Sequence, residues 1–268
     1  MNYTLNINGN LLDLAKPKVM GIINITPDSF FAESRKQTVY EIEKCVEQMI
    51  ADGVDIIDVG ACSTRPQSMP VSLDEEKERL AFALPLINRQ IDAMPHGKTI
   101  ALSIDTYRAE IAKMCIEEYE ATIINDVSGG SDKEMFSVVA ESGTPYILTA
   151  QQNNLHDILM FFSAKVCELR NLGQKDIILD PGFGFGKTVD ENFALLKELD
   201  KLSCMDLPIM VGLSRKSFIC KVLDCQPEDS LAGTIALNMV SLQKGASILR
   251  VHDVKSAVDT CRLWWGKL

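Results

Sequence analysis

The chain has 268 residues, of which 46% are hydrophobic and 24% charged, and its formal net charge is −10. This acidic balance, with no basic run, argues against a nucleic-acid-binding surface. No apolar stretch approaches the roughly 18 residues of a membrane-spanning helix. The first residues show no secretory leader pattern, and the eight cysteines are scattered singly with no C-x-x-C pair. We therefore expect a cytoplasmic protein with reduced thiols that contacts neither a membrane nor a nucleic acid.

Residues 3–13 alternate apolar and polar around Asn8-Gly9-Asn10, a pattern that predicts a short β-hairpin. Eight apolar runs follow, and each is expected to form a strand. They cover 19–23, 54–59, 99–104, 121–124, 145–148, 177–179, 208–211 and 246–249. Helical patterns, with apolar residues every three or four positions, alternate with these runs. They cover 39–52, 74–92, 108–118, 132–142, 155–171, 190–202, 229–244 and 253–265.

The order of these elements indicates the fold class. The strand candidates are continuously apolar rather than alternating, which is typical of parallel strands covered on both faces. Eight β/α units over this length predict an α/β protein with a (β/α)8 TIM barrel behind the N-terminal hairpin. A doubly wound open sheet is the main alternative. We find no linker or low-complexity segment and expect a single domain over residues 1–268.

Polar residues follow nearly every strand candidate. Any one of them could simply mark a strand end that meets solvent. In a barrel, however, all these ends converge on one face, where barrel enzymes hold their active sites. The residues are Asn24, Thr64 with Arg65, Asp105, Asn125, Asp180, Lys216, and Arg250 with His252.

The stretch from Asp180 to Lys187 stands out because three glycines alternate with Phe183 and Phe185 after an apolar run. Taken alone, it could be a glycine-rich turn whose rings cap the core. Beside the other strand ends, it indicates a loop that approaches a flat ligand closely, since glycine permits positive φ and the rings offer apolar walls.

The side chains at the strand ends divide by chemistry. Asp105, Asn125 and Asp180 suit a flat heterocycle rich in N–H groups, whereas Arg65, Arg250 and His252 suit a phosphate or diphosphate. The Asn24 side-chain oxygen could bind Mg²⁺, and Ser217, where a helix is expected to begin, could bind a carboxylate. No motif for a covalent nucleophile or a P-loop is present. These residues favour catalysis by positioning and by stabilising a leaving diphosphate.

Several segments resemble the signatures of the dihydropteroate synthase family. Met20–Phe30 and Gly60–Pro66 are similar to its first two, and five more segments match in order along the chain: 103–106, 124–126, 180–187, 212–217 and 250–253. The resemblance implies a TIM barrel, usually dimeric, that acts as a transferase in folate synthesis. The family joins 6-hydroxymethyl-7,8-dihydropterin diphosphate to 4-aminobenzoate and releases diphosphate by a dissociative, Mg²⁺-assisted substitution.

The resemblance also implies roles for individual residues. The pterin would be held by Asp105, Asn125, Asp180 and Lys216. The diphosphate would be held by Arg65, Arg250 and His252, with Thr64 beside it, and Mg²⁺ by Asn24. The aminobenzoate pocket would be shaped by Thr64, Pro66, Phe185, Lys216 and Ser217. Asp105, Asp180, Lys216 and Arg250 are the candidate catalytic residues.

Three segments depart from the family pattern. Residues 31–37 lack the glycines usual in the first loop, and Gln67 stands where the family has a glycine. Residues 149–154 replace the family's His-Met segment, and we interpret this replacement as loop variation. These departures mildly favour a non-catalytic pterin-binding paralogue as an alternative. A methyltetrahydrofolate–corrinoid methyltransferase barrel is a further alternative, but it needs neither the diphosphate cations nor the Arg65-Pro66 loop.

Overall fold

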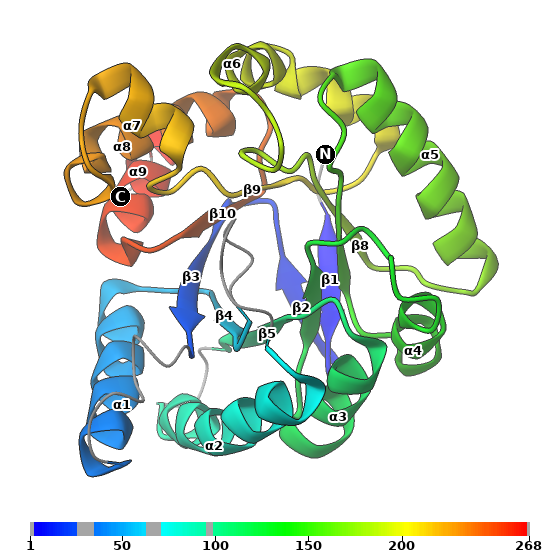
Figure 1. Ribbon diagram of the computed structural model, residues 1–268, viewed down its shortest axis with the longest axis vertical. Coiled ribbons are helices and arrows are strands. Elements are labelled where there is room, and N and C mark those ends of the chain that lie inside the picture. The colour runs from blue at the N-terminus through cyan, green and yellow to red at the C-terminus, as the bar shows by residue number, and fades with distance from the viewer. Residues whose placement is uncertain (1–2, 26–34, 63–70, 95–98, 267–268) are drawn as a thin grey trace.

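Eight parallel strands form a barrel in the computed structural model, which describes residues 3–25, 35–62, 71–94 and 99–266 (Figure 1). The strands are β3 Lys18–Asn24, β4 Ile56–Gly60, β5 Ala101–Asp105, β6 Ile123–Asp126, β7 Tyr146–Thr149, β8 Ile177–Asp180, β9 Met210–Val211 and β10 Ile248–Val251. They pair in the order β8-β7-β6-β5-β4-β3-β10-β9. A parallel bridge between Leu179 and Ile209 joins the two ends of this order. The predicted barrel is confirmed, and the open sheet is excluded.

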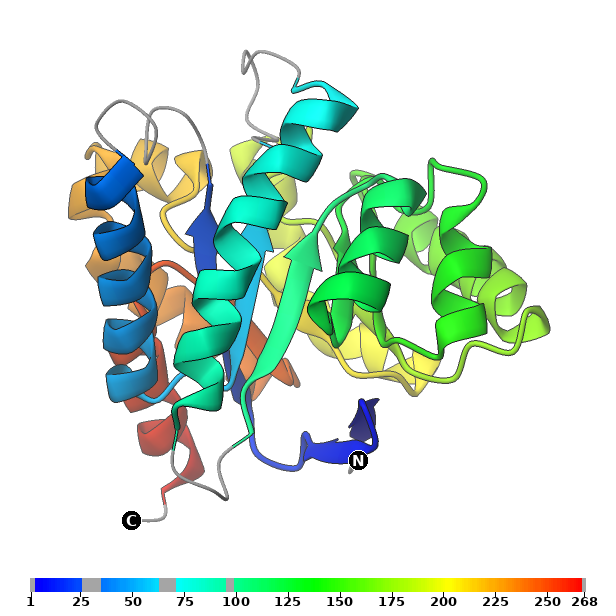
Figure 2. The ribbon, with the colours of Figure 1, turned by 90° about the horizontal axis from the view of Figure 1, so that it is seen from below.

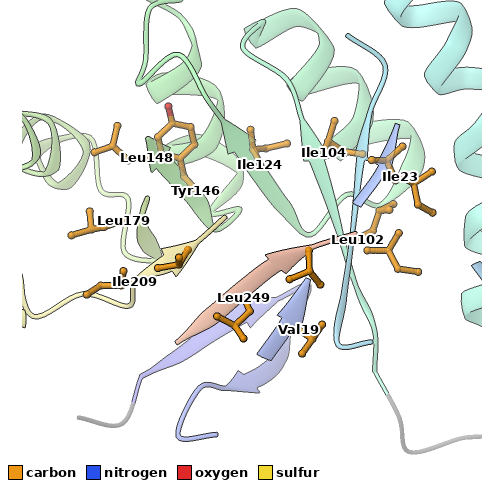
Figure 3. Packing of buried hydrophobic residues seen from close by; sticks show 14 of the residues in the cluster. Val19, Ile23, Leu102, Ile104, Ile124, Tyr146, Leu148, Leu179, Ile209 and Leu249 are labelled. Carbon is orange, nitrogen blue, oxygen red and sulfur yellow. The ribbon is translucent and has the colours of Figure 1, made fainter. Parts of the chain in front are cut away.

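Helices surround the barrel and lie between successive strands (Figures 1 and 2). They are α1 Arg35–Asp52, α2 Leu73–Asp92, α3 Ala109–Tyr119, α4 Met135–Ser142, α5 Leu155–Asn171, α6 Val189–Lys197, α7 Ser217–Leu223, α8 Leu231–Gln243 and α9 Val254–Trp265. Two 3-10 helices, η2 Leu199–Met205 and η3 Pro227–Asp229, follow α6 and α7. The apolar side chains between strands and helices form the main core; Figure 3 shows part of it, including Val19, Leu102, Tyr146 and Leu249.

The predicted hairpin is present and closes one end of the barrel (Figure 2). Strands β1 Thr4–Ile7 and β2 Asn10–Asp13 pair antiparallel, and Asn8 and Gly9 turn the chain with positive φ of 50° and 84°. Apolar hairpin side chains pack on one inward residue from each barrel strand. We call these eight residues the apolar plug: Met20, Ile56, Ala101, Ile123, Ile147, Ile178, Met210 and Ile248.

Most strands end one or two residues later than the apolar runs predict. Asp105, for example, pairs with Asn125, and Thr149 pairs with Asp180, so these residues lie within the sheet rather than after it. Backbone pairing with neighbouring strands, rather than the loss of apolar character, decides where each strand ends. The interpretation of 149–154 as loop variation is therefore wrong for Thr149, which is the last residue of β7.

Candidate active site at the carboxyl ends of the strands

Alternation along the strands decides which side chains meet inside the barrel. Residues next to the apolar plug, such as Leu148 and Leu179, belong to the outer core. The residue two positions after each plug residue therefore points inward again, one step nearer the carboxyl ends. These eight residues, which we call the polar ring, are Ile22, Asp58, Ser103, Asn125, Thr149, Asp180, Gly212 and Arg250. Three of the predicted site residues thus share one layer.

Asp58 is the centre of the hydrogen bonds in the polar ring, although the sequence analysis did not single it out. Its carboxylate is fully buried and accepts hydrogen bonds from Ser103 Oγ at 2.6 Å and Asn125 Nδ2 at 3.1 Å. Arg250 Nε donates to the same carboxylate at 2.7 Å. Asp58 lies inside an apolar run, Ile56-Ile57-Asp58-Val59, and this lone charge was the signal available in the sequence.

Arg250 bridges Asp58 to Asp105, the last residue of β5. Its Nη2 donates to Asp105 Oδ2 at 2.6 Å. Burial raises the pKa of Asp105 to about 7, although the Arg250 guanidinium opposes this rise. The pKa of Arg250 is raised, because the nearby Asp58 and Asp105 carboxylates outweigh the burial that would lower it. The guanidinium therefore stays charged and links β10 to the acidic side chains of the adjacent strands β4 and β5.

Asn125 presents an acceptor with no partner. Its Nδ2 faces the Asp58 carboxylate, which can only accept when it is ionised, so the orientation of the amide is determined. The opposite atom, Oδ1, is buried and has no hydrogen bond within the described residues. A ligand N–H group is the kind of donor that would give this oxygen its missing hydrogen bond.

Asp180 ends β8 and lies in the polar ring two positions beyond Ile178 of the plug. Its Oδ1 accepts the Gly182 N–H at 2.8 Å. Burial raises the pKa of Asp180, and the Lys216 ammonium and the Gly182 N–H oppose the rise. The carboxylate thus lies beside one fixed donor and one part-buried cation.

The glycine-rich loop after Asp180 wraps closely around Lys216. The Lys216 ammonium donates to the Phe183 carbonyl and lies 4.7 Å from the centre of the Phe185 ring. Gly184 has a φ of +81°, and a Cβ there would stand 2.8 Å from Lys216 Cδ, so the close approach requires glycine. Phe183 is fully buried in the core, whereas Phe185 is half-buried at the site. Phe183 therefore packs in the core, as the alternative interpretation of the loop predicts, whereas contact between Phe185 and a flat ligand stays a prediction.

Two residues beyond the predicted set hold this loop in place. Lys187 is buried and donates to the Gly182 carbonyl at 2.8 Å; burial lowers its pKa to about 8. Asn192 of α6 accepts the Gly184 N–H at 2.7 Å and donates to the Thr188 carbonyl at 2.7 Å. The side chain of an adjacent helix thus fixes the backbone that carries Phe185.

The remaining predicted site residues lie around the rim or outside the described residues. Asn24 ends β3 and pairs in register with Gly60, which pairs in turn with Asp105. His252, just past β10, is exposed, and its Nδ1 lies 3.0 Å from Ser214 Oγ. Ser217 is the exposed first residue of α7. Thr64, Arg65 and Pro66 lie outside the described residues.

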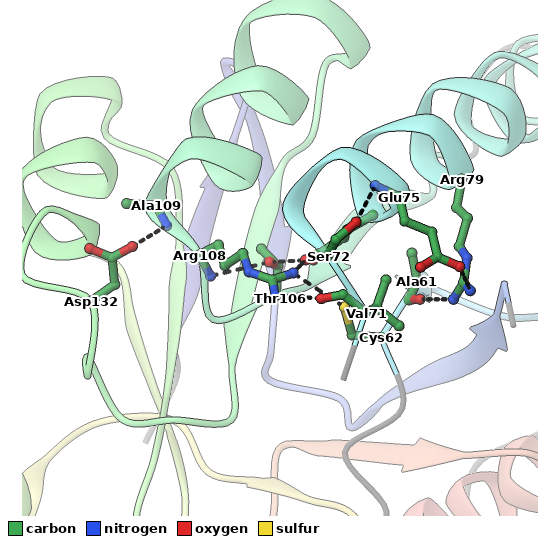
Figure 4. A network of polar contacts seen from close by, with 11 residues as sticks. Ala61, Cys62, Val71, Ser72, Glu75, Arg79, Thr106, Arg108, Ala109 and Asp132 are labelled. Carbon is green, nitrogen blue, oxygen red and sulfur yellow. Dashed lines mark hydrogen bonds and ion pairs between the residues drawn. The ribbon is translucent and has the colours of Figure 1, made fainter. Parts of the chain in front are cut away.

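A buried polar network flanks the segment that carries those three residues (Figure 4). Arg79 Nη1 donates to the Ala61 carbonyl at 2.7 Å, and Arg108 Nη2 donates to the Val71 carbonyl at 2.7 Å. Fully buried Glu76 pairs with Arg108 and accepts from Thr106 Oγ1 at 2.8 Å. These side chains anchor the chain on both sides of residues 63–70.

Comparisons with known proteins agree with this geometry. The pterin binding enzyme family matches residues 20–252. The dihydropteroate synthase of Bacillus subtilis is 38% identical over 257 residues, which are 92% of this chain and 87% of the relative. The Xanthomonas albilineans dihydropteroate synthase, solved with 4-aminobenzoic acid, is 31% identical with a TM-score of 0.90 and covers 99% of this chain and 98% of its own.

A dihydropteroate synthase from Clostridium difficile, solved in the presence of pteroic acid, is 33% identical with a TM-score of 0.87. The match covers 94% of this chain and 97% of that one. Sequence relatives and solved structures thus lead to one family along nearly the whole chain. This chain belongs to the pterin-binding enzymes, among the dihydropteroate synthases, which are transferases.

Proposed function

We propose that this chain joins 6-hydroxymethyl-7,8-dihydropterin diphosphate to 4-aminobenzoate, forming 7,8-dihydropteroate and diphosphate. The observation that carries the proposal is the arrangement at the barrel mouth. Two buried carboxylates and an unpartnered amide oxygen lie at the ends of β5, β6 and β8, with Arg250 on β10 and Lys216 after β9 as the two cations. The relatives solved with 4-aminobenzoic acid and pteroic acid support the same chemistry.

The pterin would occupy the polar ring. Asn125 Oδ1 would accept a ring N–H, and Asp180 would take a second donor edge beside the Gly182 N–H. Lys216, held against Phe183 and Phe185, would donate to a ring acceptor. As the carbon–oxygen bond to diphosphate breaks, positive charge develops on the pterin, and the Asp105 and Asp180 carboxylates would stabilise it.

The diphosphate would lie toward the rim. Arg250 and His252, two positions apart at the end of β10, would bind its oxygens together with Arg65. Mg²⁺ fits here on the chemistry of the donors. The described residues offer no cluster of three acidic, histidine or cysteine ligands, but the side-chain oxygen of Asn24 is a ligand of the kind that Mg²⁺ prefers, and Asn24 would hold the ion. When bound, Mg²⁺ would supply positive charge against the departing diphosphate.

The 4-aminobenzoate would lie between Phe185 and Lys216 on one side and the Thr64–Pro66 segment on the other. Ser217 would bind its carboxylate. The aniline nitrogen would then attack the methylene carbon from which diphosphate leaves, and the nitrogen would lose one proton. The residues therefore act by positioning and charge stabilisation, without a covalent enzyme intermediate.

We further propose that the enzyme is a cytoplasmic homodimer. The eight cysteines are all free thiols, which supports a reducing compartment. Apolar side chains stand exposed on α7 and α8, among them Val222, Leu223 and Ile235, with exposed fractions of 56, 49 and 36%. A surface of this kind supports contact with a second copy.

The test is diphosphate release from the purified protein with the pterin diphosphate and Mg²⁺, with and without 4-aminobenzoate. Release that depends on aminobenzoate, with dihydropteroate as product, is the expected result. Pterin binding without turnover would overturn the proposal in favour of a non-catalytic paralogue. Arg250→Ala should weaken binding of the diphosphate ester far more than binding of the diphosphate-free pterin. Equal losses for both ligands would contradict the phosphate role of Arg250.

A further inference from the structure

Thr149 carries a hydroxyl that the fold itself does not use. It is the last residue of β7, fully buried, and its Oγ1 has no hydrogen-bond partner within the described residues. Its neighbours Leu148 and Ala150 belong to the outer core, whereas Ile147 belongs to the apolar plug. Alternation therefore directs the Thr149 side chain into the barrel, in the polar ring.

The position of Thr149 places it between the groups proposed to hold the pterin. Strand β7 lies between β6, which carries Asn125, and β8, whose Asp180 pairs in register with Thr149. The Thr149 methyl group also lies 3.4 Å from the position that a Cβ on Gly182 would take. The hydroxyl and the unpartnered Asn125 Oδ1 thus lie on neighbouring strands, with Thr149 two residues beyond Ile147, the register partner of Asn125.

Two buried polar atoms that have no hydrogen-bond partner among the described residues are costly to the protein, because burial without a hydrogen bond raises its free energy. Valine has the same shape as threonine, also favours strands, and has no hydroxyl that would be buried without a hydrogen bond. A ligand that supplies the missing partners removes the penalty. The unused hydroxyl therefore indicates a ligand edge rather than a packing role.

We infer that Thr149 is a specificity-determining residue, whose hydroxyl forms with Asn125 Oδ1 a two-atom hydrogen-bonding edge for a planar nitrogen heterocycle. Asn125 Oδ1 takes a ring N–H, and the Thr149 hydroxyl takes the adjacent polar ring atom, since it can donate or accept. This inference rests on the proposed function, in which the heterocycle is the pterin. It adds to that function a residue from the segment where the sequence departs from its family.

The test compares Thr149→Val with Thr149→Ser. Binding of 6-hydroxymethyl-7,8-dihydropterin without diphosphate is measured by calorimetry, and Tm is measured without ligand. Thr149→Val should weaken pterin binding about tenfold, because one buried hydrogen bond is lost. The same variant should raise the ligand-free Tm by about 2 °C or more, because the unpartnered hydroxyl is gone. Thr149→Ser, which keeps the hydroxyl, should keep most of the affinity.

A matched control is Thr144→Val, two residues before the start of β7. Thr144 is also buried, but its hydroxyl accepts from Ser142 Oγ at 3.0 Å. This variant should leave pterin affinity unchanged and should not raise Tm. Undiminished pterin affinity in Thr149→Val, beside a wild type that binds, would overturn this inference alone. A wild type that binds no pterin would overturn the proposed function and this inference together.

Discussion

Asp58 offers the sharpest test of how the site is held together, because it accepts three hydrogen bonds while fully buried. Asp58→Asn keeps the shape of the side chain but removes its charge. The new amide keeps one acceptor oxygen and replaces the other with an NH2 group, which faces either the Ser103 hydroxyl or the donors of both Asn125 and Arg250. Arg250 then keeps Asp105 as its remaining ion-pair partner among the described residues.

The magnitude follows from this count of partners. Breaking a buried ion pair from one side costs about 3–5 kcal/mol. Arg250 retains Asp105 and its side chain is 19% exposed, so we expect the lower end, about 3 kcal/mol of the free energy of unfolding. For a chain of this size, that loss corresponds to a fall in Tm of roughly 6–12 °C. Pterin affinity should fall as well, because the Asn125 amide loses the acceptor that fixes its orientation.

Urea unfolding followed by circular dichroism measures the stability change, and calorimetry measures the affinity. Asp259→Asn is the control, because Asp259 pairs with Lys255 on the surface, with both side chains about half exposed. It should change neither quantity measurably. If Asp58→Asn lowers the free energy of unfolding by less than about 1 kcal/mol, the reasoning is refuted, because the hydrogen bonds to the buried carboxylate would then contribute little to stability.

Two further predictions concern the loop around Lys216. Burial lowers the pKa of Lys216 to about 8, although Asp180 opposes this shift. Because the charged form is the one proposed to donate to the ligand, kcat/KM for the pterin diphosphate should fall as pH rises above about 8. In Lys216→Arg the side chain stays charged and this alkaline fall should disappear; a fall that persists would assign it to another group. Gly182→Ala would place a Cβ 1.9 Å from the Ala150 carbonyl oxygen at a φ of +70°, and backbone cannot move aside cheaply. It should lower the free energy of unfolding by more than about 2 kcal/mol. Gly186→Ala is the control, because Gly186 has a similar φ of +66° but open space where its Cβ would stand. Urea unfolding should show a loss of about 1 kcal/mol in the free energy of unfolding, from backbone strain alone. Equal losses in the two variants would mean that the contact with Ala150 has no cost.

Part of the candidate site could be predicted from the sequence because its residues stand where apolar runs stop. Asp105, Asn125 and Asp180 each follow such a run, and the barrel rule brings those ends to one face. Asp58 and Thr149 were missed for the opposite reason. Asp58 interrupts a run that continues past it, and Thr149 lies at the start of a segment that resembled a variable loop.

The order and period of apolar residues determined the hairpin, the alternation of strands and helices, and the convergence of polar ends. These are local patterns, readable along the chain. Only the tertiary structure decided which face of each strand is inner, because both faces of a parallel barrel strand are buried and their apolar pattern is the same. Strand register then placed Thr149 beside Asp180 and let Arg250 reach Asp58, 192 positions away in the chain. Contacts between such distant residues depend on closure of the barrel, which no short stretch of sequence encodes.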